Sequence, residues 1–214
     1  VAAALDAAPR AAIILQVFLD STPAWRAAHP GDLVRFGAGT VAPPEVFARA
    51  RSAADIVSPT WQAAVSARLY DLVTHVERAP WGHRVIGYEL LAGDLGAWRP
   101  LGSALGLGER STPEREQAFR RWAIAHYAGV ERFRDAWLGQ RRGLTGVLGA
   151  NPPGFEGLRV PPPLEAGAEP SLYDPATDRP MIDWQQFQAE AQAQALLASA
   201  EQVRAATGGR KLVG

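Results

Sequence analysis

The chain contains two nearly uninterrupted apolar runs, Ala12–Leu19 and Val85–Leu91, which have the length of β-strands. Such runs are typical of parallel strands that are covered on both faces. A helical pattern lies between them, with Ser58 suited to the N-cap and Pro59 suited to the first helical position. We therefore predict a strand, a crossover helix and a second parallel strand in a right-handed unit. The predicted apolar face of this helix consists of Trp61, Val65, Leu69, Leu72 and Val76.

Three more helices and one more strand follow from the pattern. Ser111-Thr112-Pro113-Glu114 has a capping-box pattern and is expected to open a helix, which a short second helix follows. Asp183 is expected to cap a long helix that ends near Ala206, and Lys211–Val213 begins another strand. The predicted buried residues are Phe119, Trp122 and His126/Tyr127 in the first helix, Val130, Phe133 and Trp137 in the second, and Trp184, Phe187, Ala191, Ala195 and Ala198 in the third.

Two stretches interrupt this alternation. Residues 21–54 form a long connection, and a loop of this length inside a domain is usually functional. Residues 139–180 are rich in glycine and proline, and we expect an excursion rather than a core element. The chain begins with Val1 and ends as a strand starts, so we expect residues 1–214 to be a single partial domain, an internal piece of a longer protein.

Composition excludes several classes of protein. Of the 214 residues 47% are hydrophobic, which is enough for a core, and the net charge is zero. A balanced charge without a sustained basic run argues against nucleic-acid binding, and no apolar run reaches the roughly 18 residues of a membrane span. The chain has no cysteine, and its four histidines are scattered without metal-ligand spacing. No phosphate-binding or dinucleotide-binding motif is present, so we expect neither a metal nor an organic cofactor.

Each of the two strands is followed by a carboxylate and then by a tryptophan. Asp20 and Trp25 follow the first strand, and Asp94 and Trp98 follow the second. In a β/α barrel the carboxyl ends of the strands build the active site. Carboxylates beside flat aromatic rings suit a sugar-binding cleft. Asp94 is the candidate general acid, because burial after an apolar strand can raise its pKa, and its alternative role is to cap a turn.

The other candidates also have two interpretations each. Glu89 lies inside an apolar strand on the side of Val85 and Leu91, and it needs a sugar hydroxyl, an arginine or a structural ion pair as its partner. Asp20 suits sugar-hydroxyl binding or a turn. Trp25 and Trp98 suit stacking on sugar rings or ordinary packing in the core. The tryptophans expected in the core are Trp61, Trp122, Trp137 and Trp184.

Six motifs together resemble the barrel of glycoside hydrolase family 42, the β-galactosidase clan. They are Pro23-Ala24-Trp25 with His29-Pro30, Ser58-Pro59-Thr60-Trp61, Val85-Ile86-Gly87-Tyr88, Phe119-Arg120-Arg121-Trp122, His126-Tyr127 with Ala136-Trp137, and Ile182-Asp183-Trp184-Gln185-Gln186-Phe187. Their order and spacing are similar to the family's over nearly the whole chain. The resemblance implies an α/β fold, a partial (β/α)8 TIM barrel with roughly strands 3 to 5 and their helices.

The resemblance also implies retaining hydrolysis of O-glycosidic bonds by two carboxylates about 5–5.5 Å apart. In the family the acid belongs to an Asn-Glu pair at the end of the fourth strand, and the nucleophile lies on a later strand, outside this chain. Here Ala92-Gly93 occupy the place of the pair, and Asp94 follows one residue later. In a second alignment, to divergent members, Ala97 stands in place of the Glu.

The leading hypothesis is a fragment of a β-galactosidase-like glycoside hydrolase that acts on an oligosaccharide or glycoside and is inactive alone. A cytoplasmic location is favoured, and a homo-oligomer is one option for the full protein. The alternative is a degenerate sugar-binding barrel without hydrolase activity. An enzyme of another class on the same fold is a further alternative. The isolated piece would leave strand edges and apolar faces exposed, so we expect it to be poorly soluble.

Overall fold

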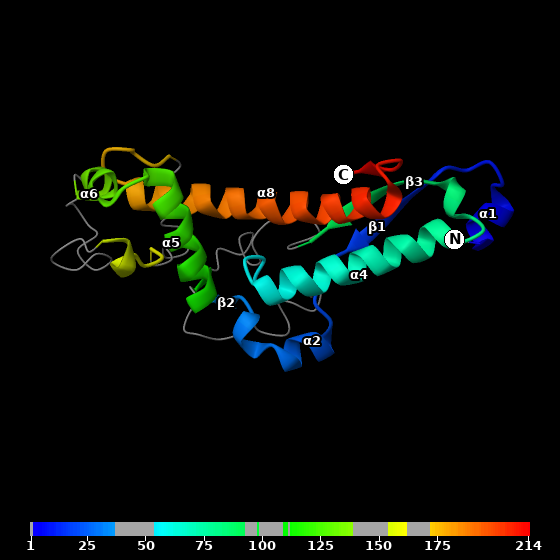
Figure 1. Ribbon diagram of the computed structural model, residues 1–214, viewed down its shortest axis with the longest axis horizontal. Coiled ribbons are helices and arrows are strands. Elements are labelled where there is room, and N and C mark those ends of the chain that lie inside the picture. The colour runs from blue at the N-terminus through cyan, green and yellow to red at the C-terminus, as the bar shows by residue number, and fades with distance from the viewer. Residues whose placement is uncertain are drawn as a thin grey trace.

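A three-stranded parallel sheet forms the centre of the structure, and its strands lie side by side in chain order (Figure 1). β1 (Ile13–Phe18) pairs with β3 (Val85–Leu91), and β3 pairs with β5 (Leu212–Val213). β2 (Arg35–Phe36) and β4 (Glu109–Arg110) form a separate antiparallel ladder. The three predicted strands are therefore confirmed to within about a residue at each end.

This computed structural model describes residues 2–36, 54–92, 98, 109–110, 112–138, 154–161 and 172–214. Helices occupy most of the remaining described residues. They are α1 (Ala2–Ala7), α2 (Pro23–Ala28), α4 (Pro59–Arg78), α5 (Pro113–Tyr127), α6 (Val130–Leu138) and α8 (Arg179–Thr207), with single 3-10 turns η1 (Pro30–Asp32), η2 (Gly82–Arg84) and η4 (Phe155–Gly157).

The crossover helix begins where the sequence predicts. Ser58 is the N-cap of α4, and its Oγ accepts a hydrogen bond of 3.1 Å from the backbone N–H of Trp61. Trp61, Leu69 and Val76 are buried as expected. Leu72 is 41% exposed, so its assignment to the apolar face is wrong, and the position is taken by Val73.

α4 and the carboxyl-terminal half of α8 cover the same face of the sheet. The first core joins Leu69, Val73 and Val76 of α4 to Tyr88 and Leu90 of β3, and then to Ala195, Ala200 and Val203 of α8. Strands in chain order with both crossover helices on one face define a singly wound β/α arrangement, the local pattern of a β/α barrel. A doubly wound sheet would carry helices on both faces.

The other face of the sheet is uncovered by the described residues. Ile14 is 56% exposed, Phe18 59% and Leu212 66%. The expectation that the first strand is covered on both faces is therefore wrong for this chain, in which β1 alternates between half-buried and exposed residues.

A second core lies beside the first and holds the predicted helix pair. It is built by α5, α6, η4 and the amino-terminal half of α8. α8 has 29 residues, so it is about 43 Å long and reaches both cores. It ends at Gly208, whose φ of +59° is the left-handed conformation that favours glycine at a helix end. The buried residues of the second core are Phe119, Ala123, Tyr127, Phe133, Trp137, Leu158, Trp184 and Phe187.

Asp183 lies inside α8 rather than at its start, which corrects the predicted cap. The helix begins at Arg179, and Asp183 is fully buried in its second turn. Its carboxylate accepts hydrogen bonds from the Tyr127 hydroxyl and, at 2.8 Å, from Nε1 of Trp137, while Nε of Arg179 lies 2.8 Å from Oδ1. Burial, and then the bond to Asp183, raises the pKa of Tyr127 to about 12. The carboxylate thus ties three helices together.

The solvent exposure of three other residues corrects the predicted helix faces. Trp137 and Trp184 are buried, but Trp122 is only partly buried and His126 is exposed. Ala198 of α8 is also exposed, so it does not belong to the buried face.

Within the described residues no helix is both long and apolar enough to cross a membrane.

A buried ion pair joins the two cores. Nε of Arg115 donates to Oδ2 of Asp55 at 3.0 Å, and Nη2 donates to Oδ1 at 2.9 Å. Arg115 occupies the third position of α5, behind Thr112, which is the N-cap. The predicted capping box would need an acidic residue or glutamine at this position. It holds Arg115 instead, which reaches across to Asp55.

The uncovered face of the sheet gives a direct stability test. Leu90→Ala should lower the free energy of unfolding by about 2–5 kcal/mol, because the side chain is in the first core. Phe18→Ala, on the adjacent strand and the opposite face, should change it by no more than about 0.5 kcal/mol. Urea denaturation of this chain measures both. Equal losses would contradict the assignment of the two faces.

Candidate functional site

The carboxyl ends of β1 and β3 meet at one edge of the sheet. Phe18 pairs with Leu91, and the N–H of Leu19 donates to the carbonyl of Leu91 at 2.7 Å. Asp20 and Ala92 follow directly, so the chain leaves both strands at this edge. The structure therefore brings the two predicted strand ends together, as parallel pairing of β1 with β3 requires.

The segment after β1 is held by local hydrogen bonds. Oγ1 of Thr22 caps α2 by accepting a 3.2 Å bond from the N–H of Trp25, and Nη1 of Arg26 donates to the carbonyl of Ser21 at 2.5 Å. Trp25 packs against the first core and lies against the His29 ring, with the ring centroids 4.6 Å apart. Its indole is half-buried, so one part supports the core and another part faces solvent.

Trp98 closes the segment after β3. Its N–H donates to the carbonyl of Ala92 at 2.8 Å, and its Nε1 donates to the carbonyl of Leu90 at 2.8 Å. Its φ is +55°, which costs a non-glycine residue energy and occurs often at functional sites. Asp94, the predicted general acid, lies in the segment that Trp98 closes, outside the described residues.

Glu89 has a partner on the uncovered face of the sheet. Nε2 of Gln16 donates to its Oε2 at 2.8 Å, and the two residues are register partners on β1 and β3. The partner of the Glu89 carboxylate is therefore an amide, and not the arginine or ion pair that the sequence also allowed. Gln16 was missed by the sequence analysis, although an amide inside an otherwise apolar strand is a signal for such a pair. The expectation that Glu89 lies on the same side of the strand as Val85 is wrong. Val85 belongs to the first core, on the other face of the sheet, because the pairing of β1 with β3 shifts by one residue between Ile13 and Ile14.

Two buried polar atoms, of Ser21 and of Trp61, have no hydrogen-bond partner among the residues that the structure describes. They are Oγ of Ser21, which follows β1, and Nε1 of Trp61, in the first turn of α4. The start of α4 is tied to η1, which follows α2, because Oγ of Ser58 donates to Oδ1 of Asp32 at 2.5 Å. Buried polar groups are nearly always paired, so unpaired ones point to a bound molecule or water.

The described residues of this edge offer groups that can bind hydroxyls. Among the described residues no group of three or more His, Asp or Glu side chains could hold a metal ion. Carboxylate oxygens at Asp20 and Glu89, together with the Gln16 amide, can accept and donate hydrogen bonds to a polyol. Whether Asp20, Trp25, Glu89 and Trp98 bind a substrate, and whether Asp94 protonates one, stays a prediction.

Comparison with solved structures defines the class of fold. The chain matches the β-galactosidase of the psychrophilic Marinomonas ef1 with a TM-score of 0.65 and 15% identity, over 93% of this chain and 26% of that protein. It matches the β-galactosidase of the Antarctic haloarchaeon Halorubrum lacusprofundi with a TM-score of 0.66 and 16% identity, over 94% and 26%. The chain thus shares the α/β fold of one part of these enzymes.

A third match gives the same result. The β-galactosidase of Bacillus circulans sp. alkalophilus has a TM-score of 0.60 and 15% identity, over 91% of this chain and 25% of its own length. The chain therefore spans about a quarter of the solved structures that it matches. No family model and no curated protein matches it.

Trp98→Phe tests how the end of β3 is held. The substitution keeps an aromatic ring but removes the indole donor to Leu90, so it should lower the free energy of unfolding by about 1 kcal/mol. Trp25→Phe is the matched control, because its ring packs on the same core while its indole makes no hydrogen bond within the described residues. Chemical denaturation of both variants gives the comparison. A larger loss in Trp25→Phe would contradict the role of Trp98.

Proposed function

We propose that the chain is the central part of a (β/α)8 barrel that hydrolyses O-glycosidic bonds in a β-galactoside or a similar glycoside. The observation that carries this proposal is the match of a singly wound β/α unit to β-galactosidases over more than nine-tenths of the chain. In such a barrel the edge beyond Phe18 and Leu91 faces the substrate. The proposal includes a glycoside as the bound partner and no organic cofactor.

The roles follow from the chemistry of each group. Asp94 is the proposed general acid, which gives a proton to the leaving-group oxygen as the glycosidic bond breaks. Asp20 and Glu89 are proposed to accept hydrogen bonds from sugar hydroxyls, and Trp25 and Trp98 to supply apolar surface to the sugar ring. The two hydrogen bonds that hold Trp98 against Leu90 and Ala92 support its proposed role, because a binding group acts best when its own position is fixed.

A second candidate function is sugar binding without hydrolysis. It is favoured by one feature of the sequence, the Ala92-Gly93 pair at the place where the resemblance to glycoside hydrolases leads one to expect Asn-Glu. In that case the same strand ends would hold a sugar, but no acid would protonate the leaving group. Binding without turnover distinguishes this function from hydrolysis.

Asp94→Asn in the complete protein that contains this chain tests the acid. We expect kcat/KM for lactose, which reports the step that breaks the glycosidic bond, to fall by about 10²–10⁴-fold, because asparagine keeps the shape but cannot donate the proton. The loss should be smaller for a nitrophenyl β-galactoside, whose leaving group needs little protonation. Initial rates for the two substrates measure the difference.

Glu201→Gln is the control, since its side chain is exposed on α8 and, within the described part of the chain, pairs only with Arg204. Its kcat/KM should be unchanged. An equal loss for both substrates would contradict the acid role of Asp94. If the unmodified protein binds lactose but hydrolyses neither compound, the sugar-binding function replaces the proposal.

A further inference from the structure

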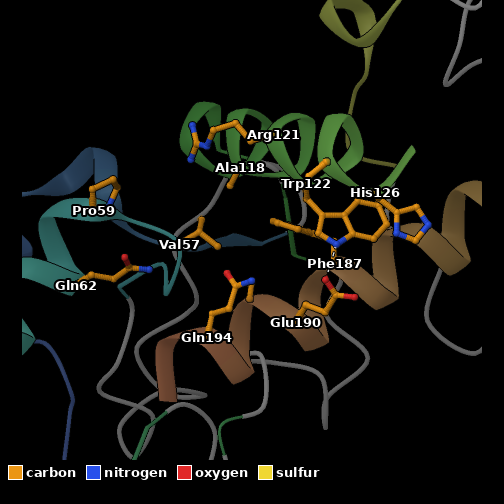
Figure 2. A pocket seen from close by; sticks show the side chains of 12 residues that line it. Val57, Pro59, Gln62, Ala118, Arg121, Trp122, His126, Phe187, Glu190 and Gln194 are labelled. Atoms are coloured by element: carbon orange, nitrogen blue, oxygen red, sulfur yellow. Dashed lines mark hydrogen bonds between the residues drawn. The ribbon is translucent and has the colours of Figure 1, made fainter. Parts of the chain in front are cut away.

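A groove of about 590 Å³ lies between α5 and α8, beside the start of α4 (Figure 2). Its volume is within the range of about 300–1,000 Å³ that is typical of small-molecule sites. Ala118, Trp122 and Ala125 face it from α5, and Phe187, Ala191 and Gln194 face it from α8. Both sets follow the i, i+4, i+7 spacing of one helix face. The alanines leave the space open where larger side chains would fill it.

Glu190 is a fixed acceptor at one side of the groove. Its Oε2 accepts from Nε1 of Trp122 at 2.7 Å, a bond between two side chains that Figure 2 draws. Its Oε1 accepts from Nε2 of Gln186 at 2.8 Å. These bonds lower the pKa of Glu190. An ionised carboxylate can accept about four hydrogen bonds, so capacity is left for a ligand.

Gln62, Gln194 and Arg121 also offer hydrogen-bonding groups that have no partner among the described residues. Gln62 donates through Nε2 to the carbonyl of Ile56 at 2.7 Å, which orients the amide and leaves its Oε1 as an acceptor. Gln194 and Arg121 make no hydrogen bond or ion pair within the described residues. The groove therefore presents fixed acceptors, an amide and a guanidinium around an apolar floor of Val57, Phe187 and the alanines.

The charges of the groove favour a neutral ligand. Arg121 and Glu190 carry opposite charges. An anion bound near Arg121 would therefore be repelled by Glu190, and a cation bound near Glu190 would be repelled by Arg121. A ligand with many hydroxyls can donate to the carboxylate and to the Gln62 oxygen, and can accept from the guanidinium and the Gln194 amide. Its C–H surface can lie against Phe187 and the exposed part of Trp122.

We propose that this groove binds a neutral saccharide of one or two units, at a place that shares no residue with the strand-end site. The inference does not rest on the proposed hydrolysis, because it uses only the residues of α5, α8 and the start of α4. It also gives a reason why Trp122, which the sequence assigns to the core, is only partly buried.

Isothermal titration of this 214-residue chain with lactose tests the proposal. We expect binding, and we expect Glu190→Gln to weaken it about tenfold or more, because a charged acceptor is lost. Ala191→Leu should abolish it by filling the groove. The matched controls are Glu201→Gln and Ala198→Leu, which are exposed on the same helix outside the groove and should bind as the unmodified chain does.

Each remaining outcome overturns the inference. These outcomes are no heat of binding with lactose, or binding that is unchanged in both Glu190→Gln and Ala191→Leu. A second titration uses phosphate in place of lactose and tests for an anionic ligand. If phosphate binds more tightly than lactose, and Arg121→Gln removes that binding, the groove is a site for anions instead. Thermal unfolding of each variant by circular dichroism separates lost binding from lost structure.

Discussion

The structure depends on the buried ion pair between Asp55 and Arg115. The two side chains are 1% and 5% exposed, and two parallel hydrogen bonds join them. Neither ion is solvated by bulk water, so each needs the opposite charge of the other, and the N–H of Val57 and the hydroxyl of Thr112 also donate to the Asp55 carboxylate. Asp55 follows Ala54 of the first core, while the Arg115 guanidinium lies 5.9 Å from the ring centroid of Trp184 in the second. The pair therefore fixes the start of α4 against the start of α5.

Both proposed sites depend on this junction. The strand-end edge is supported through Asp32, whose carbonyl accepts from the N–H of Asp55 at 2.8 Å and whose carboxylate accepts from Ser58. The groove needs α5 held at one distance from α8. α8 makes the second connection, since it reaches from Trp184 in one core to Val203 in the other. The groove in particular is lined by side chains of helices, which hold a site more precisely than loops do.

Local patterns in the sequence predict most of the elements but not the long-range polar pairs. The apolar runs predict β1 and β3, and Ser58-Pro59 predicts the start of α4, because strand length and capping are local properties. Asp183 looks like a cap in the sequence, yet its partners Tyr127 and Trp137 lie 56 and 46 positions away. Only the packing of α5 and α6 on α8 brings these donors to it.

The candidate site shows the same limit. Asp20 and Trp98 could be placed at strand ends from the sequence, because parallel strands end at one edge. The pairing of Gln16 with Glu89 depends on the register of two strands 73 residues apart, which includes a one-residue shift that no local pattern indicates. The groove is open because small alanine side chains line it on α5 and α8. That these two helix faces lie opposite each other is a property of the tertiary fold and cannot be read from a local pattern.

Native-state hydrogen exchange would test most directly whether the Asp55–Arg115 pair couples the two cores. The amides of Leu69–Val73 in α4 report on the first core, and those of Phe119–Ala123 in α5 report on the second. In the unmodified chain both sets should open with the same free energy, because the cores unfold together. In Asp55→Asn the α5 set should open first, at a free energy lower by about 3–5 kcal/mol. Separate opening energies in the unmodified chain, or a common value in the variant, would contradict the account.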